Sequence, residues 1–254
     1  MLKGFSETVR QHDPDRFFTA LFAPAEKRDV LFALYAFNHE LARARAVVSE
    51  PHLALIRLHW WREVVQGTTK RHPLAEAIHA ALGAGALHAG DLLDMIDARE
   101  AETDPAIPTL DAWRAYLLGT AGGIAVAAAR LLGMAQPDIV RPLGAAYGVA
   151  ATLRAVPALA RQGRCLLPAD ILDTYGLSPE AVVSGADPTP AIAALARVGQ
   201  DFLHPLAVPR GAVAAVLPAI LARRDLRRLP IAVGPRGLGD RVAVTWAGLR
   251  GRIG

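Results

Sequence analysis

The densest group of residues that could do chemistry is a run of four acids. Asp91, Asp94, Asp97 and Glu100 follow one another at steps of three. On a helix this spacing brings neighbouring carboxylates together, and two carboxylates can share a Mg²⁺ ion, which prefers oxygen ligands. The alternative is a solvated helix face whose acids are balanced by Arg99. Acidic runs are usually solvated, which favours the second interpretation.

Motifs for other common reactions are absent from the sequence. It contains no GxxxxGK[ST], no HExxH and no GxSxG, so a phosphate loop, a zincin site and a serine-hydrolase elbow have no support. The eight histidines are scattered. His52 and His59 share one expected helix, but they are seven residues apart, which is too far for the two side chains to chelate one ion easily. Cys165, the single cysteine, has no neighbouring His or acid that would activate its thiol. We assign no catalytic residue, no metal ligand and no cofactor.

Three arginines are candidates for binding an anion. Arg57, Arg154 and Arg164 could converge on a phosphate, which arginine grips bidentately without a metal. The alternative is structural ion pairing, with Glu40 and Glu63 as partners, because buried arginine is usually paired. Both interpretations remain open.

A second basic group lies near the carboxyl end. It forms either an exposed helix face or a docking surface for acidic lipid or a partner protein. Its members are Arg223, Arg224, Arg227 and Arg228.

Proline and glycine mark the helices that must position these side chains. Asp13-Pro14 and Ser178-Pro179 are typical helix starts. Pro157 is expected to end or kink its helix, because proline lacks the backbone donor. No strand pattern is visible, and Thr109–Met134 is one long segment rich in small residues. The other expected helices cover residues 13–21, 24–51, 51–67, 73–82, 87–101, 137–155, 168–175, 187–204, 209–228 and 240–250.

The segment Leu31–Pro51 is the most regular of these helices. Its apolar and polar positions recur at three- and four-residue steps, so they share one face. The amino-terminal half of that face is apolar. The carboxy-terminal half, where a buried enzyme helix often carries acids, has Ala42, Arg43 and Ala46 instead.

Composition supports a single all-α domain over residues 1–254. Apolar residues make up 52% and charged residues 20% of the 254 residues, which excludes a disordered chain. The net charge of +4 is far from a nucleic-acid signature. Leu117–Ala135 is the most membrane-like window, and we interpret it as a core helix. Without a signal peptide or transmembrane helix, we expect a cytoplasmic protein, with peripheral membrane contact through the basic run.

Six stretches resemble the squalene/phytoene synthase family, and the similarity covers roughly residues 12–180. Residues 188–254 would be the last helices of the same domain. The resemblance implies the all-helical isoprenoid synthase fold, a bundle around a central cavity. The stretches are DPDR at 13–16, LFAP at 21–24, LFALYAFNHEL at 31–41, IRLHWWR at 56–62, TAGG at 120–123 and GRCLLPADIL at 163–172.

Enzymes of this family join two prenyl diphosphates head to head, with Mg²⁺ bridging carboxylates and diphosphate. The resemblance places their first acidic motif on Ala42, Arg43 and Ala46, and their diphosphate-binding arginine on His39. The second acidic motif falls on Ala155 and Leu159. Since these side chains cannot replace carboxylates, prenyl transfer by the family mechanism is not expected. The positions expected to line the cavity are Tyr35, Trp60, Gly123, Gly148 and Ala151.

The remaining pattern resembles an aspartate-lacking branch of the family, which includes a mitochondrial complex I assembly factor and bacterial relatives. The shared pieces are AFN-x-ELA at 36–42, VSE at 48–50, R-(L/M)-x-(F/W)-W at 57–61, LRA-x-P at 153–157 and LP-x-D at 167–170. The implied role is non-catalytic help in complex I assembly, with respiratory-complex subunits or assembly proteins as partners, in a bacterial cytoplasm. One alternative is binding of an isoprenoid or anionic lipid without turnover. Another is an active synthase whose Mg²⁺ ligands have moved to Asp91, Asp94 and Asp97.

Overall fold

The computed structural model describes residues 4–48, 50–231 and 234–253 of the chain. Ser49, in the VSE stretch, and part of the expected loop 230–239 lie outside these residues. The described helices are α1 (Phe5–His12), α2 (Pro14–Ala20), α3 (Ala25–Ala46), α4 (Pro51–Val65), α5 (Pro73–Gly83), α6 (Ala89–Arg99), α7 (Leu110–Gly119), α8 (Ala121–Leu131), α9 (Arg141–Ala160), α10 (Ala169–Thr174), α11 (Pro179–Val183), α12 (Thr189–Asp201), α13 (Pro218–Arg228) and α14 (Leu238–Arg250).

Three 3₁₀ turns and one minimal sheet complete the described secondary structure. The turns are η1 (Glu100–Glu102), η2 (Pro137–Val140) and η3 (Arg210–Ala215). Strands β1 (Leu206–Ala207) and β2 (Arg252–Ile253) pair antiparallel. The prediction of no strand was therefore wrong at these four residues, which are too few to give an alternating pattern. The all-α class is confirmed.

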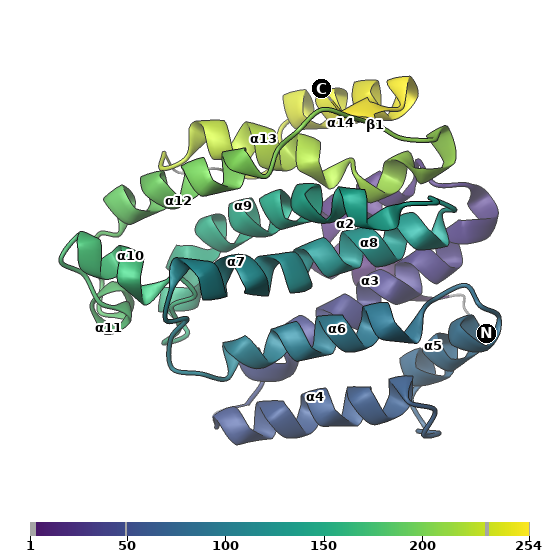
Figure 1. Ribbon diagram of the computed structural model, residues 1–254, viewed down its shortest axis with the longest axis horizontal. Coiled ribbons are helices and arrows are strands. Elements are labelled where there is room, and N and C mark those ends of the chain that lie inside the picture. Colours follow the sequence, from purple (N-terminus) through teal and green to yellow (C-terminus); the bar gives the residue numbers. More distant parts are fainter. Residues whose placement is uncertain (1–3, 49, 232–233, 254) are drawn as a thin grey trace.

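Helix α9 is the centre of the bundle. It packs against α7, α8, α12 and α13, while α3 packs against α1, α4, α5 and α8 (Figure 1). Two glycines let α8 and α9 approach closely. A Cβ on Gly144 would lie 2.4 Å from the Ala121 carbonyl oxygen, and one on Gly148 would lie 2.6 Å from the Ala121 Cβ. Small residues therefore set the helix spacing at the heart of the fold.

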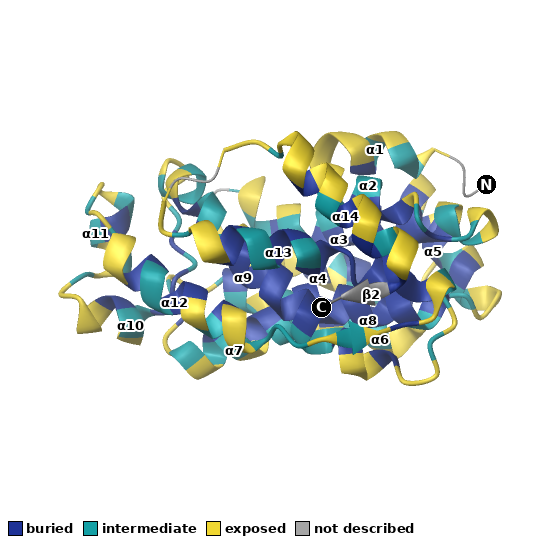
Figure 2. Cartoon of the chain, turned by 90° about the horizontal axis from the view of Figure 1, so that it is seen from above, coloured by how far each residue is buried: buried dark blue, intermediate teal, exposed yellow. Residues whose placement is uncertain are grey.

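Burial follows this arrangement. The middle of the bundle is buried, and the outer faces of the peripheral helices are exposed (Figure 2). Among the described helices, the stretch Pro137–Ala160 is long and apolar enough to cross a membrane, and 56% of its most apolar window is buried inside the protein. A core helix passes the same test, and α9 is the most central helix of the bundle.

The helix boundaries differ from expectation at several points. Pro157 lies inside α9, which continues to Ala160. Proline in the last turn removes one hydrogen bond, and its exposed ring does not disturb a neighbour, so the helix persists. The segment Thr109–Met134 divides at Thr120 into α7 and α8. Helix α1 was not predicted, and residues 209–228 divide into η3 and α13.

Candidate functional site

A cavity of about 430 Å³ lies between α3, α7 and α9. Ala42 lines it from α3, and Ala155 and Leu159 line it from α9. Two of the expected cavity residues, Gly148 and Ala151, also line it. The helices that carry the two altered acidic stretches therefore face each other across one cavity. Their apolar side chains leave no carboxylate at these positions.

A buried ion cluster at one end of the cavity contains its only acid among the described lining residues. Glu102, in η1, forms ion pairs with Arg99 and with Arg164, whose Nη2 lies 2.9 Å from its Oε2. Tyr116 donates its hydroxyl to the same carboxylate at 2.8 Å. Burial by itself would raise the pKa of Glu102, but Arg99, Arg164 and Tyr116 together hold it below its usual range. Glu102 therefore stays ionised, and its oxygens are already engaged.

Arg16 also lines the cavity. It is 8% exposed, and its guanidinium stands 4.8 Å from the ring centroid of Tyr147 and 5.9 Å from that of Tyr35. Asp13, which also caps α2, accepts a hydrogen bond from Arg16 Nη1 at 2.7 Å. Burial is the largest influence on Arg16 and lowers its pKa, but the charge and hydrogen bond of Asp13 together with Tyr147 and Tyr35 outweigh it, and the net shift is upward. Tyr35 lies beside Arg16 but does not line the central cavity, so the prediction that it does is wrong.

His39, at the position of the family's diphosphate-binding arginine, cannot replace it well. Its ring stacks on that of His12, with centroids 4.3 Å apart and planes 11° from parallel. Burial lowers the pKa of His39, and the neighbouring His12 lowers it further. The neutral form is favoured, so His39 contributes no charge for a phosphate.

The three candidate anion-binding arginines do not converge. Arg164 lies in the central cavity, but Arg154 pairs with the fully buried Asp225 at 3.0 Å. Arg57 lies in a separate surface groove, 3.7 Å from Glu40. The predicted pairing with Glu40 is therefore present, and a common anion site is wrong. Sequence spacing could not show that α4 and α9 present these residues to different spaces.

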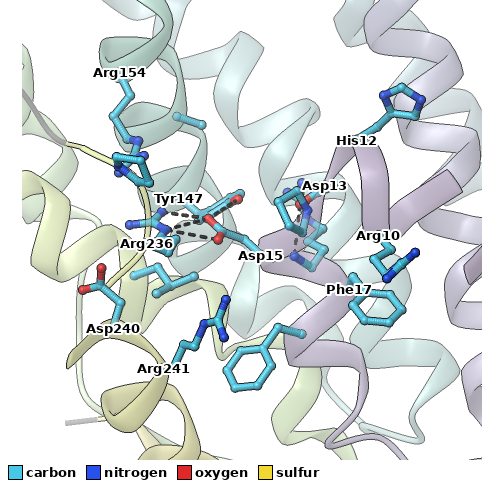
Figure 3. Close-up of a pocket in the computed structure, with 16 residues that line it drawn as sticks. Arg10, His12, Asp13, Asp15, Phe17, Tyr147, Arg154, Arg236, Asp240 and Arg241 are labelled. Atoms are coloured by element: carbon cyan, nitrogen blue, oxygen red, sulfur yellow. Dashed lines mark hydrogen bonds and ion pairs between the residues drawn. The ribbon is translucent and has the colours of Figure 1, made fainter. Parts of the chain in front are cut away.

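Arg154 borders a second cavity, of about 830 Å³. This cavity shares His12, Arg16, Tyr147 and Ala151 with the first, so the two adjoin each other at these side chains. Arg236 crosses it from the segment after α13 and pairs with Asp15 and Asp225, both at 2.7 Å (Figure 3). Figure 3 shows the Asp15 carboxylate between the Arg236 guanidinium and Tyr147, whose hydroxyl donates a hydrogen bond to Asp15 Oδ2 at 3.1 Å.

Three other expected positions lie away from the central cavity. Trp60 lines the surface groove on α4 and packs edge-on against Trp61 and His72, because α4 is a peripheral helix. Gly123 faces α6, where a Cβ would lie 2.9 Å from Met95 Cγ. Arg43 is exposed and pairs with Glu40 at 2.8 Å, next to the exposed Ala46. Trp60 and Gly123 therefore contribute to helix packing, whereas Arg43 and Ala46 lie on the surface.

The family model described as squalene/phytoene synthase matches residues 9–232. The chain belongs to the squalene/phytoene synthase family. Two solved members of the fold are similar over nearly the whole chain. A dehydrosqualene synthase in complex with ligand has a TM-score of 0.74 at 15% identity, covering 97% of this chain and 94% of that one. A squalene synthase from Alicyclobacillus acidocaldarius has a TM-score of 0.62 at 16% identity, covering 98% and 95%. At these identities the likeness shows the fold.

Curated relatives lie in one branch of the squalene/phytoene synthase family. The chain is 30% identical over 182 residues to complex I assembly factor 6 of Bos taurus, and 29% identical to that of Homo sapiens. Each match covers 68% of this chain and 55% of the relative. A Drosophila melanogaster homolog is 24% identical over 188 residues, covering 69% and 56%. The chain thus spans about 55% of the length of these relatives, and the resemblance to this branch is confirmed.

Squalene/phytoene synthases need Mg²⁺ ligands on both sides of the cavity, and the residues present do not fit that ion. Mg²⁺ takes carboxylate and phosphate oxygens in near-octahedral geometry. Ala42, Ala155 and Leu159 offer none, and Glu102 is saturated by two arginines and a tyrosine. The described residues contain no group of three His, Cys, Asp or Glu side chains arranged to hold a metal.

The acidic run on α6 does not supply the missing ligands. Asp91 pairs with Arg130 at 2.7 Å, and Asp97 and Glu100 pair with Arg62 at 2.5 and 2.8 Å. Asp94 and Asp97 are exposed. Arg99 does not balance this run, as had been expected, because it turns inward to Glu102. The run is a solvated, ion-paired face.

The sequence interpretation missed the residues that shape the cavity most. Arg16, Arg99, Glu102, Tyr116 and Tyr147 lie on five different elements, and no spacing rule connects them. One signal was present in the sequence. Arg16 belongs to the DPDR stretch that carries the family resemblance, yet only its Asp-Pro was used, as a helix start.

Proposed function

We propose that this chain is a non-catalytic squalene/phytoene synthase-like protein that assists respiratory complex I assembly. One observation carries the non-catalytic part. Apolar residues stand where the two metal-binding motifs face each other, and the two carboxylates at the cavity are already paired, Glu102 with two arginines and Asp13 with Arg16. The complex I part is supported by the names of the curated relatives. Its partners would then be subunits or assembly proteins of the complex. A bacterial, cytoplasmic location beside the membrane that holds the complex remains a prediction.

Two measurements test this proposal. Deleting the gene in the source organism should lower NADH:ubiquinone oxidoreductase activity and leave unassembled complex I intermediates on native gels. Purified protein should release no diphosphate from farnesyl or geranylgeranyl diphosphate with Mg²⁺. Turnover that depends on Mg²⁺ would refute the non-catalytic role, and normal complex I in the deletion strain would refute the assembly role.

Ligand binding without turnover is a second candidate function. The two adjoining cavities together offer room for an extended ligand, and Arg16, Arg99 and Arg164 border the space. Arginine can hold a diphosphate or a lipid phosphate without a metal. Calorimetric titration with farnesyl diphosphate should show the same affinity with and without Mg²⁺. The double variant Arg99→Gln with Arg164→Gln should bind more weakly. The same affinity in both proteins would exclude this site.

A further inference from the structure

Helix α14 carries an apolar surface that no other described element covers. Four of its large side chains are between 56% and 81% exposed. We call them the α14 stripe: Leu238, Val242, Trp246 and Leu249. At about 100° per residue they span an arc of about 80° on one side of the helix. Asp240, Val244 and Ala247 lie on the opposite side and are buried.

The stripe has arginine on both edges. By the same helical geometry, Arg250 lies about 40° beyond Trp246, and Arg241 lies about 60° beyond Leu238 on the other side. Both are exposed. The Arg250 guanidinium stands 4.2 Å from the ring centroid of Trp246. An apolar stripe of Leu, Val and Trp between arginines is the pattern of helices that lie in the plane of a bilayer surface.

The surrounding segment has a strongly asymmetric charge. Residues 202–254 contain nine arginines and two aspartates, with no lysine and no glutamate, whereas the whole chain carries +4. Asp225 and Asp240 are both buried and paired with arginine. No described carboxylate of this segment therefore faces solvent beside the stripe.

The basic run on α13 contributes differently from what its sequence suggests. Arg224 and Arg228 lie 2.6 and 3.6 Å from Asp240 and so tie α13 to α14. Arg223 is half-buried. The prediction that these four arginines form one exposed face is therefore wrong. The run fixes the orientation of α14, and Arg227 and Arg228 extend the positive surface.

We propose that α14 docks this protein on an anionic phospholipid bilayer. The stripe would lie at the boundary between headgroups and acyl chains, with the flanking arginines at the headgroups. A second copy of the chain fits less well, because a symmetric contact would bring two strongly positive faces together. Each arginine beside an anionic surface strengthens binding about fivefold, which is about 1 kcal/mol. The proposal is separate from the role in complex I assembly, since it concerns the purified protein and lipid alone.

Vesicle co-sedimentation of the full chain tests the proposal. Vesicles containing phosphatidylglycerol should bind the protein, vesicles of phosphatidylcholine alone should bind it much less, and added salt should weaken the binding. Leu249→Glu should lower binding at least about tenfold. The matched control is Ile56→Glu, because Ile56 is 61% exposed on α4, at the opposite end of the bundle (Figure 1). Arg241→Gln with Arg250→Gln should lower binding about 30-fold.

Trp246 provides a direct readout of contact. Trp61 and Trp113 are buried, so brominated phosphatidylglycerol should quench the emission of the native protein more than that of Trp246→Phe. Circular dichroism melting should show that all variants stay folded. Equal binding to both vesicle types, or equal binding of Leu249→Glu and Ile56→Glu, would overturn the proposal. So would a native dimer that Leu249→Glu dissociates without changing vesicle binding, since the stripe would then be a protein interface.

Discussion

Replacing Glu102 by glutamine tests whether this carboxylate stabilises the fold as the counter-ion of the buried arginines beside the central cavity. Glutamine keeps the shape but removes the charge that faces Arg99 and Arg164. The Glu102 side chain is 5% exposed, and those of the two arginines are 13% and 11% exposed. Two buried guanidinium groups would lose their counter-ion. Breaking a buried pair in this way costs about 3–5 kcal/mol. For a chain of this size that corresponds to a melting temperature lower by roughly 6–20 °C.

Urea unfolding followed by circular dichroism measures this free energy, and thermal melting checks it. The control is Glu7→Gln, since Glu7 pairs with Arg10 on the surface, where the side chains are 53% and 60% exposed. Solvent screens such an exposed pair, so it contributes little to the free energy of unfolding. If Glu102→Gln is no more destabilising than Glu7→Gln, the assigned role of Glu102 as the counter-ion of this cluster is refuted.

The same pair of proteins has a predictable pH dependence. The pKa of Glu102 in the folded protein lies below the unfolded value of 4.5. The unfolded state therefore binds this proton more readily, and the stability from Glu102 is fully present above that value. It is lost as the pH falls through the lower folded pKa. The difference in unfolding free energy between native protein and Glu102→Gln should be constant near neutral pH and shrink below pH 4.5.

Four further substitutions, each measured by urea unfolding, test other parts of the structure. Arg236→Gln should cost about 1.5–3 kcal/mol, because the buried Asp225 loses one of two charged partners; no change would mean that the Arg236 pairs do not persist in solution. Gly144→Ala should cost about 1–3 kcal/mol or prevent folding, because its Cβ would meet a carbonyl at 2.4 Å. Gly90→Ala, with no atom within 4 Å of the new Cβ, should instead gain about 0.5 kcal/mol, and equal effects at the two glycines would contradict the packing. Asp97→Ala should change stability by less than about 1 kcal/mol, since the pair with Arg62 is exposed.

Local signals in the sequence were enough to place most of the helices. Asp13 caps α2 and Ser178 caps α11, as their sequences indicate, because capping depends on residues three apart. The division at Thr120 was not predicted although Gly119 lies directly before it, because glycine is tolerated inside helices and only tertiary packing decides whether the helix is interrupted there. Pro157 shows that the rule that proline ends a helix can fail. The residue lies in the last turn of α9 and its ring is exposed, so the helix continues.

The cavity was predictable in part. The family resemblance placed Ala42 and Ala155 on facing helices, and both line the cavity. Side-chain direction was harder to foresee. Arg99 follows the exposed Asp94 and Asp97, yet it turns inward because Glu102 is buried behind it. Pairing between residues on different elements depends on how the helices pack. A single sequence carries no direct signal for such packing.

Arg236 places the end of the folding unit beyond the end of the sequence match. The family model stops at residue 232, but the guanidinium that neutralises Asp15 and Asp225 comes from four residues later. A fragment cut at residue 232 would leave Arg154 as the one described partner of the buried Asp225 and would free Asp15 from its ion pair. The amino-terminal helices therefore depend on a residue 221 positions further along the chain. Fragments meant to fold alone should extend past it.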